Sequence, residues 1–272
     1  AKFFLKDRIQ KYYTEMNILK LLNEKKSTFA PKYIETIYGT DMIVVIQEFI
    51  KGQLLSNYYE SSIAKSKIIN QLIQLKIELS KIEIENYGYI SGITGQSESW
   101  FSFISRSAIN DDAIFLQWND ILDKSDLNVA NEIFQKHKEL IKSREKKHVL
   151  NHGDFTPLNI IYGTHHSLYL VDWELAVSGD PLFDISWQIN QENETTYWDF
   201  ELKEIFRQFR DKFKEDFLKE NPSLNTYEYD ALINIYRICI TLRTLRYWIG
   251  RDSHRIDLIK KQLIQLISTQ EY

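Results

Sequence analysis

Three oxygen-bearing side chains recur at short intervals within HVLNHGDFTPLNIIYGTHHSLYLVDWELAVSGDPLFD, residues 148 to 184. Asp154 and Asn159 are five residues apart with Pro157 between them, and Asp172 follows thirteen residues after Asn159. Proline fixes φ and disfavours helix, so the first two side chains belong to a rigid turn. Amide and carboxylate oxygens suit a hard cation such as Mg²⁺, and a further carboxylate can accept a proton from a hydroxyl.

A predicted hairpin brings two of these side chains together. If residues 160–162 pair with 168–171 across Gly163 and Thr164, Asn159 and Asp172 lie at the same open end of the hairpin. Asp154 is then one turn away, free to act as a base. A metal-binding pair beside a carboxylate base is the set of groups used in phosphoryl transfer from a nucleotide.

The elements around this stretch predict an α+β chain of two unequal lobes. KFFLKD reads as a strand, residues 9–24 as a helix, and 32–52 as a β-hairpin around Gly39-Thr40-Asp41. Residues 87–100 read as a Gly/Ser-rich loop, and the stretch after the predicted 160–171 hairpin as another. We place the amino-terminal lobe at 1–50 and the carboxy-terminal lobe at 51–272. The second lobe is predicted to be mostly helical, with helices over 62–84, 126–142, 200–219, 227–250 and 254–269.

Composition excludes several classes of protein. The 272 residues carry 34 basic and 38 acidic side chains, a net charge of −4 that favours neither nucleic acid nor an anionic membrane as partner. No apolar run approaches the length of a membrane span, and AKFFLKDRIQ lacks the features of a signal peptide. One cysteine, Cys239, precludes an internal disulfide and is compatible with a reducing cytosol, so we expect a cytoplasmic protein.

The motifs HGDFTPLN, LVDWE and GDPLFD resemble those of the aminoglycoside phosphotransferase and choline kinase family, small-molecule kinases with a protein-kinase-like fold. The resemblance covers most of the chain in order. It implies Asp154 as the catalytic base and Asn159 and Asp172 as Mg²⁺ ligands. It also implies structural roles for His152 and Asp184, which would hold the catalytic loop by hydrogen bonds, and it places Trp173 where protein kinases have phenylalanine.

The resemblance implies an ATP or GTP site in the first lobe. A kinase of this kind needs a strand lysine and a helix glutamate, and FFLK followed by a helix favours Lys6 with Glu15. Lys2 is the less favoured alternative. The family's linker between lobes resembles VVIQEFIKGQLL, which implies that the adenine is framed by Gln47, Glu48, Phe49 and Ile50. In the family a phosphate-covering hairpin precedes the lysine strand. We expect residues before Ala1 in the native protein that form it, and the alternative is a protein without this hairpin.

The identity of the phosphate acceptor stays open, because acidic and basic stretches of the sequence favour acceptors of opposite charge. Glu174 and the acidic stretch NQENETTYWDFE favour an ammonium-bearing acceptor such as an aminoglycoside or choline. Arginines on NIYRICITLRTLRYWIGR, among them Arg243 and Arg246, favour an anionic or sugar-phosphate acceptor. Trp248 can stack on a sugar ring, and HGDFTP also resembles family members associated with bacterial surface-polysaccharide synthesis, which implies a sugar acceptor.

Other chemistries fit the residues less well. No G-x-S-x-G elbow occurs, and one cysteine with the adjacent His165 and His166 does not make a zinc site. A glycosidase pair of Asp154 with Asp172 or Glu174 leaves Asn159 unexplained. The first hypothesis is therefore a Mg²⁺-dependent kinase that phosphorylates a hydroxyl of a small molecule. The second is a non-catalytic kinase-fold module that binds a nucleotide or a protein.

Overall fold

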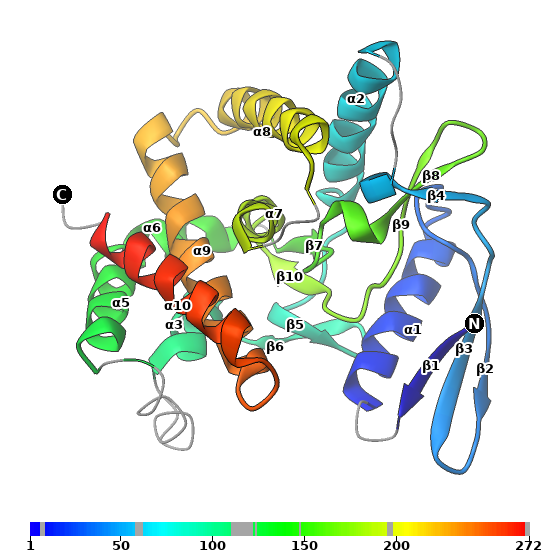
Figure 1. Ribbon diagram of the computed structural model, residues 1–272, viewed down its shortest axis with the longest axis horizontal. Helices are drawn as coiled ribbons and strands as arrows, with labels where there is room; N and C mark the ends of the chain where they lie inside the picture. Colours follow the sequence, from blue (N-terminus) through cyan, green and yellow to red (C-terminus); the bar gives the residue numbers. More distant parts are fainter. Residues whose placement is uncertain are drawn as a thin grey trace.

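The amino-terminal part of the molecule is a small antiparallel sheet with one helix packed on it (Figure 1). The computed structural model describes residues 1–5, 9–57, 62–109, 122, 124–146, 148–194 and 198–269. The strand order is β1 (Lys2–Leu5), β3 (Met42–Gln47), β2 (Tyr33–Tyr38), and the helix is α1 (Ile9–Glu24). The predicted strand, helix and hairpin are thereby confirmed. Between sheet and helix lies a small apolar cluster formed by Phe4, Tyr12, Met16, Ile43 and Val45.

Two further sheets connect this part to the helices. One is three-stranded in the order β4 (Gly52–Leu54), β8 (Ile160–Gly163), β9 (Leu168–Leu170). Its β8–β9 hairpin confirms the predicted one, with Ile160 opposite Leu170. The other sheet is four-stranded and runs in the order β6 (Thr94–Ser97), β5 (Tyr87–Ser91), β10 (Val177–Gly179), β7 (Val149–Asn151).

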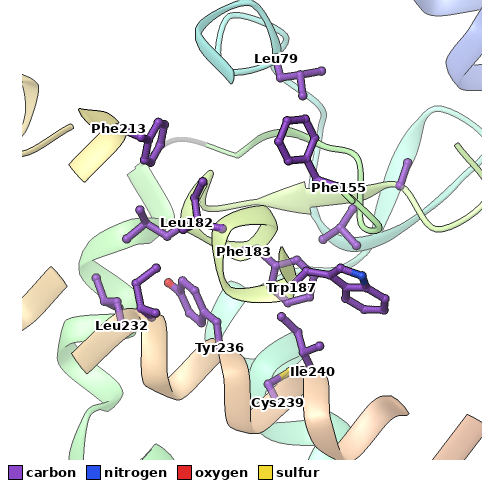
Figure 2. Packing of buried hydrophobic residues seen from close by; sticks show 14 of the residues in the cluster. Leu79, Phe155, Leu182, Phe183, Trp187, Phe213, Leu232, Tyr236, Cys239 and Ile240 are labelled. Carbon is purple, nitrogen blue, oxygen red and sulfur yellow. The ribbon is translucent and has the colours of Figure 1, made fainter. Parts of the chain in front are cut away.

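The described helices of the carboxy-terminal part surround one large apolar core. They are α2 (Ser62–Leu79), α3 (Trp100–Ile109), α5 (Lys124–Lys136), α6 (Lys138–Ser143), α7 (Leu182–Glu194), α8 (Phe200–Glu220), α9 (Thr226–Trp248) and α10 (Ser253–Ser268). Figure 2 shows how α7 meets α9 inside this core: Phe183 and Trp187 face Tyr236 and Ile240. Of the described helices, none has a stretch long and apolar enough to span a membrane.

Side-chain caps explain why the last three helices begin where the sequence predicts. Asp199 accepts a hydrogen bond from the backbone N–H of Leu202, and Asp252 accepts one from Arg255. Asn225 and Glu228 bond each other's backbone N–H groups reciprocally, forming a capping box. Such caps satisfy N–H groups that a helix leaves unpaired at its start, and each stabilises the helix by about 1 kcal/mol.

Three local predictions were wrong. The stretch 87–100 is a β5–β6 hairpin leading into α3, in which the buried residues Gly88 and Ile90 alternate with the partly exposed Tyr87, Tyr89 and Ser91. The predicted helix over 126–142 is two helices, α5 and α6, separated at His137. The loop expected after the β8–β9 hairpin contains α7, whose residues Leu182, Phe183 and Ile185 are buried.

Candidate active site

The loop between β7 and β8 carries Asp154, and hydrogen bonds from its backbone to the side chain of Asp184 fix its conformation. The two oxygens of Asp184 accept hydrogen bonds from the backbone N–H groups of His152, at 3.0 Å, and Gly153, at 2.9 Å. Gly153 adopts a positive φ of 78°, and a Cβ there would lie 1.7 Å from the carbonyl oxygen of Leu175. Only glycine therefore fits this position, and the chain reverses sharply just before Asp154.

Lys76 completes the support of the loop and was missed by the sequence analysis. Its ammonium group donates to Asp184 at 2.7 Å, and both side chains are fully buried. Asn151 lies 3.5 Å from the same ammonium, which also sits 5.6 Å from the centre of the Phe155 ring. The sequence feature that could have indicated a buried lysine is its position: Lys76 lies within the apolar stripe of α2, four residues after Leu72 and three before Leu79.

His152 links the loop to the segment that carries Asp172. One ring nitrogen bonds the carbonyl of Val171 at 2.9 Å, and the other faces the backbone N–H of Asp154 at 3.3 Å. The ring also packs on Trp173, with centroids 4.6 Å apart. Burial lowers the pKa of His152, against the opposing effect of Asp184, and this favours the neutral ring. Such contacts suit the structural role that the resemblance implied.

Asp154 is oriented by hydrogen bonds to both carboxylate oxygens. Asn159 donates its amide N–H to one oxygen at 2.8 Å, and the indole N–H of Trp187 donates to the other at 2.7 Å. Burial raises the pKa of Asp154 to about 6, although both hydrogen bonds act in the opposite direction. The carboxylate is thus a stronger proton acceptor than an ordinary aspartate. Trp187, on α7, was not predicted as a site residue.

Asn159 and Asp172 lie at the open end of the β8–β9 hairpin, as the sequence predicts. Backbone pairing continues up to them, since the N–H of Val171 donates to the carbonyl of Asn159 at 3.0 Å. Asp172 adopts a positive φ of 67°. The amide nitrogen of Asn159 is used on Asp154, which leaves its oxygen as the atom suited to a cation.

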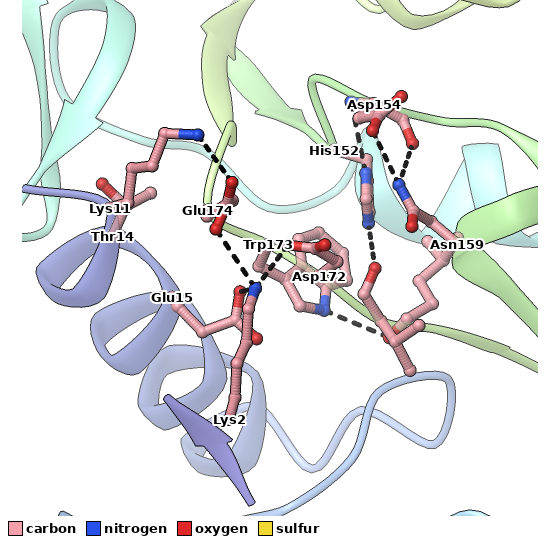
Figure 3. A network of polar contacts seen from close by, with 12 residues as sticks. Lys2, Lys11, Thr14, Glu15, His152, Asp154, Asn159, Asp172, Trp173 and Glu174 are labelled. Carbon is pink, nitrogen blue, oxygen red and sulfur yellow. Dashed lines mark hydrogen bonds and ion pairs between the residues drawn. The ribbon is translucent and has the colours of Figure 1, made fainter. Parts of the chain in front are cut away.

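Lys2 contacts the site in the part of the chain that the structure describes (Figure 3). Its ammonium group lies 3.4 Å from a carboxylate oxygen of Glu15 and donates a hydrogen bond to Asp172. Lys6 lies outside the described residues. The pattern FFLK favoured Lys6, but Lys2 and the buried Phe4 share the inner face of β1, which directs Lys2 toward α1.

Charge pairing explains the titration of this lysine and glutamate. Burial disfavours the charged form of Lys2, but the carboxylates of Glu15, Asp172 and Glu174 outweigh it and raise the pKa of Lys2. Burial raises the pKa of Glu15 to about 7, against the opposing effect of Lys2. The ammonium group of Lys2 therefore stays charged. Of its three carboxylate partners among the described residues, Glu15 alone is fully buried.

A pocket of about 320 Å³ opens beside Asp154 and contains three of the four predicted acceptor residues. Glu174, Arg243 and Trp248 line it, whereas Arg246 lines a neighbouring pocket. Sequence reasoning missed several other lining side chains, because they come from elements far apart in the chain: Lys11, Tyr89, Trp187 and Arg255. Lys11 donates to Glu174 at 2.6 Å.

The predicted adenine-binding stretch runs from the end of β3 to the start of β4. The backbone N–H of Glu48 donates to the carbonyl of Lys32, and Phe49 is 87% exposed. Gln47 has a buried side-chain oxygen with no hydrogen-bond partner among the described residues. Ile50 is half-buried. These contacts do not test adenine binding, so the assignment of these residues stays a prediction.

Comparison with known proteins identifies the architecture. Aminoglycoside phosphotransferase APH(4)-Ia, in a thermostable apo form, is similar with a TM-score of 0.72 and 13% identity, covering 96% of this chain and 84% of that one. A putative fructosamine-3-kinase from Haemophilus somnus 129PT has a TM-score of 0.62 at 14% identity, covering 97% and 82%. Choline kinase LicA from Streptococcus pneumoniae has a TM-score of 0.56 at 17% identity, covering 98% and 85%.

These likenesses confirm the predicted α+β kinase-like fold, with a strand-rich first part and a helical second part. No curated protein matches the sequence significantly. A sequence model of the phosphotransferase enzyme family matches residues 2–220, which is most of the chain. The protein therefore belongs to the phosphotransferase enzyme family.

Proposed function

We propose that this protein transfers the γ-phosphate of ATP or GTP to a hydroxyl group of a small molecule such as a sugar, an aminoglycoside or an amino alcohol. One observation carries the proposal: Asp154 lies in a pocket beside the hairpin end that holds Asn159 and Asp172, and Lys2 contacts Asp172 directly. Among the structural relatives, APH(4)-Ia is known in complex with ADP and hygromycin B, and LicA in complex with AMP. These complexes support a nucleotide site here.

Asp154 is the proposed base. It accepts the proton of the acceptor hydroxyl as the hydroxyl oxygen bonds to the γ-phosphorus and the bond from that phosphorus to the β–γ bridging oxygen breaks. The phosphate passes to the acceptor and the nucleoside diphosphate leaves. Trp187 and Asn159 fix the carboxylate by their hydrogen bonds at 2.7 and 2.8 Å, so little reorganisation is needed when the proton moves.

Lys2 is the proposed phosphate-binding lysine. Glu15 lies 3.4 Å from its ammonium group and is fully buried on α1, so it can hold the lysine in place from one side. Asp172 accepts from the same ammonium. A lysine held between two carboxylates presents a fixed positive charge to nucleotide phosphates, which is the role expected of the strand lysine in kinases.

The residues present fit a Mg²⁺ ion. The free amide oxygen of Asn159 and the half-buried carboxylate of Asp172 are hard oxygen ligands, and Mg²⁺ is commonly bound by one or two such groups together with phosphates and water. When bound, the ion would neutralise charge on the transferring phosphate. The other described residues show no cluster of three or more His, Cys, Asp or Glu suited to a metal.

Asp172→Ala is expected to weaken nucleotide binding about 10- to 100-fold when Mg²⁺ is present, because a metal ligand is lost. Affinity in EDTA should change far less. Titration of a fluorescent ATP analogue with and without Mg²⁺ measures both values. Equal affinities of the variant and the wild type in Mg²⁺ would contradict the metal assignment.

Lys2→Met is expected to weaken nucleotide binding about tenfold or more, because a charge-assisted contact to phosphate is lost. Lys6→Met is the matched control, since it removes the same charge from the same end of the chain. The same titration, with circular dichroism to verify folding, compares the two variants. A larger loss in Lys6→Met would return the role of the phosphate-binding lysine to Lys6.

A further inference from the structure

The pocket beside Asp154 is lined by three basic side chains, Lys11, Arg243 and Arg255, and by two carboxylates. Its two carboxylates, Asp154 and Glu174, are both engaged: Asp154 by Trp187 and Asn159, and Glu174 by Lys11 at 2.6 Å and Lys2 at 3.4 Å. Arg243 and Arg255 line the same pocket, and neither has a carboxylate within ion-pair distance among the residues that the structure describes. The wall that Arg243 and Arg255 form is therefore positive.

A second pocket continues this positive wall. Its volume is about 690 Å³, and it shares Arg243 and Tyr247 with the pocket beside Asp154. The side chains that set its charge are Arg106, Arg243, Arg246 and Arg251, and no carboxylate from the described residues lines it. We call this the arginine pocket. Like charges repel, so a bound anion would relieve the repulsion among these guanidinium groups.

Stacking holds two of these arginines in place without neutralising them. The guanidinium of Arg243 lies 3.7 Å from the ring centre of Phe103 and 4.9 Å from that of Tyr89. It donates one hydrogen bond, at 2.8 Å, to the carbonyl of Phe103, while its Nε and Nη1 have no hydrogen-bond partner among the described residues. Arg251 lies 4.2 Å from the ring centre of Tyr247. Pre-positioned guanidinium groups match the oxygens of a phosphate.

We propose that the arginine pocket binds a phosphate group, and that the acceptor is a phosphorylated small molecule with a free hydroxyl at its other end. The acceptor part of this inference depends on the proposed kinase function; the phosphate site itself does not. Arg243 lines both pockets, so one molecule can place its phosphate among the arginines and its hydroxyl near Asp154. In the arginine pocket a polycationic acceptor would meet Arg106, Arg243, Arg246 and Arg251, with no carboxylate from the described residues beside them.

Calorimetric titrations at constant ionic strength test the proposal, with Mg²⁺ and a non-hydrolysable ATP analogue saturating the nucleotide site. The probes are inorganic phosphate, glucose 6-phosphate, glucose and glucosamine. Inorganic phosphate and glucose 6-phosphate are expected to bind at least about tenfold more tightly than glucose or glucosamine. Equal or tighter binding of glucose or glucosamine would overturn the proposal.

The double variant Arg246→Gln/Arg251→Gln is expected to weaken phosphate binding at least about tenfold while nucleotide affinity is unchanged. Both side chains are exposed, so the variant retains the core. Arg207→Gln is the control, because it removes a charge on α8, where Arg207 pairs with Glu204 and Asp211. A comparable loss in Arg207→Gln would mean non-specific charge attraction and would refute the site. If nucleotide binding fails in the wild type, the kinase proposal falls, and phosphate titration without nucleotide still decides the arginine pocket.

Discussion

Asp154→Ala is expected to lower kcat about 1,000-fold while Mg²⁺–nucleotide affinity stays within about twofold of the wild type. The reason is the position of the carboxylate: Asp154 lines the pocket where we propose that the acceptor binds, and its side chain accepts hydrogen bonds from Trp187 and Asn159. A general base acts on the hydroxyl and not on the nucleotide. Release of the nucleoside diphosphate, measured with whichever acceptor the wild type turns over, gives kcat. Titration with a fluorescent nucleotide gives the affinity for nucleotide.

The control for this variant is Asp211→Ala, which removes an exposed carboxylate paired with Arg207 on α8. Its turnover should match the wild type. A loss of nucleotide affinity in Asp154→Ala equal to its loss of turnover would show that Asp154 binds the metal–nucleotide complex instead of the acceptor. Wild-type protein that binds nucleotide but turns over no acceptor would favour the non-catalytic kinase-fold module.

Lys76→Met is expected to lower the free energy of unfolding by about 3–5 kcal/mol, because it leaves the fully buried carboxylate of Asp184 without its cation. Asp184 would keep only its hydrogen bonds from the backbone of His152 and Gly153. Those bonds hold the loop that carries Asp154, so activity should fall together with stability. Urea unfolding measures the change.

Lys65→Met is the matched control on the same helix. Lys65 pairs with Glu201 at 3.2 Å, and both side chains are partly exposed. Exposed pairs contribute between 0 and about 1 kcal/mol, so this variant should unfold close to the wild-type midpoint. If the free energy of unfolding falls equally in both variants, the buried Lys76–Asp184 pair contributes no more to stability than an exposed pair, and the prediction is wrong.

Local pattern was sufficient for most elements and for the proximity of Asn159 to Asp172. The helix over 9–24 and the caps at Asp199, Asn225 and Asp252 follow from periodicity and from residues within four positions of each boundary. The β8–β9 hairpin follows from the turn at Gly163, and it places Asn159 near Asp172. Where local signals were ambiguous, as in 87–100, packing onto β10 decided for strand.

The sequence by itself predicted the amino-terminal strand, helix and hairpin and the proximity of Asn159 to Asp172, because spacing along a turn or hairpin constrains the side chains on it. Only the tertiary structure brought Lys2 to Glu15, since that contact depends on which face of β1 packs on α1. It also decided the pairing of Lys76 with Asp184, which are 108 positions apart, and the meeting of Arg106 with Arg243 in one pocket. Contacts at such separations depend on how the helices pack, and no local pattern encodes them.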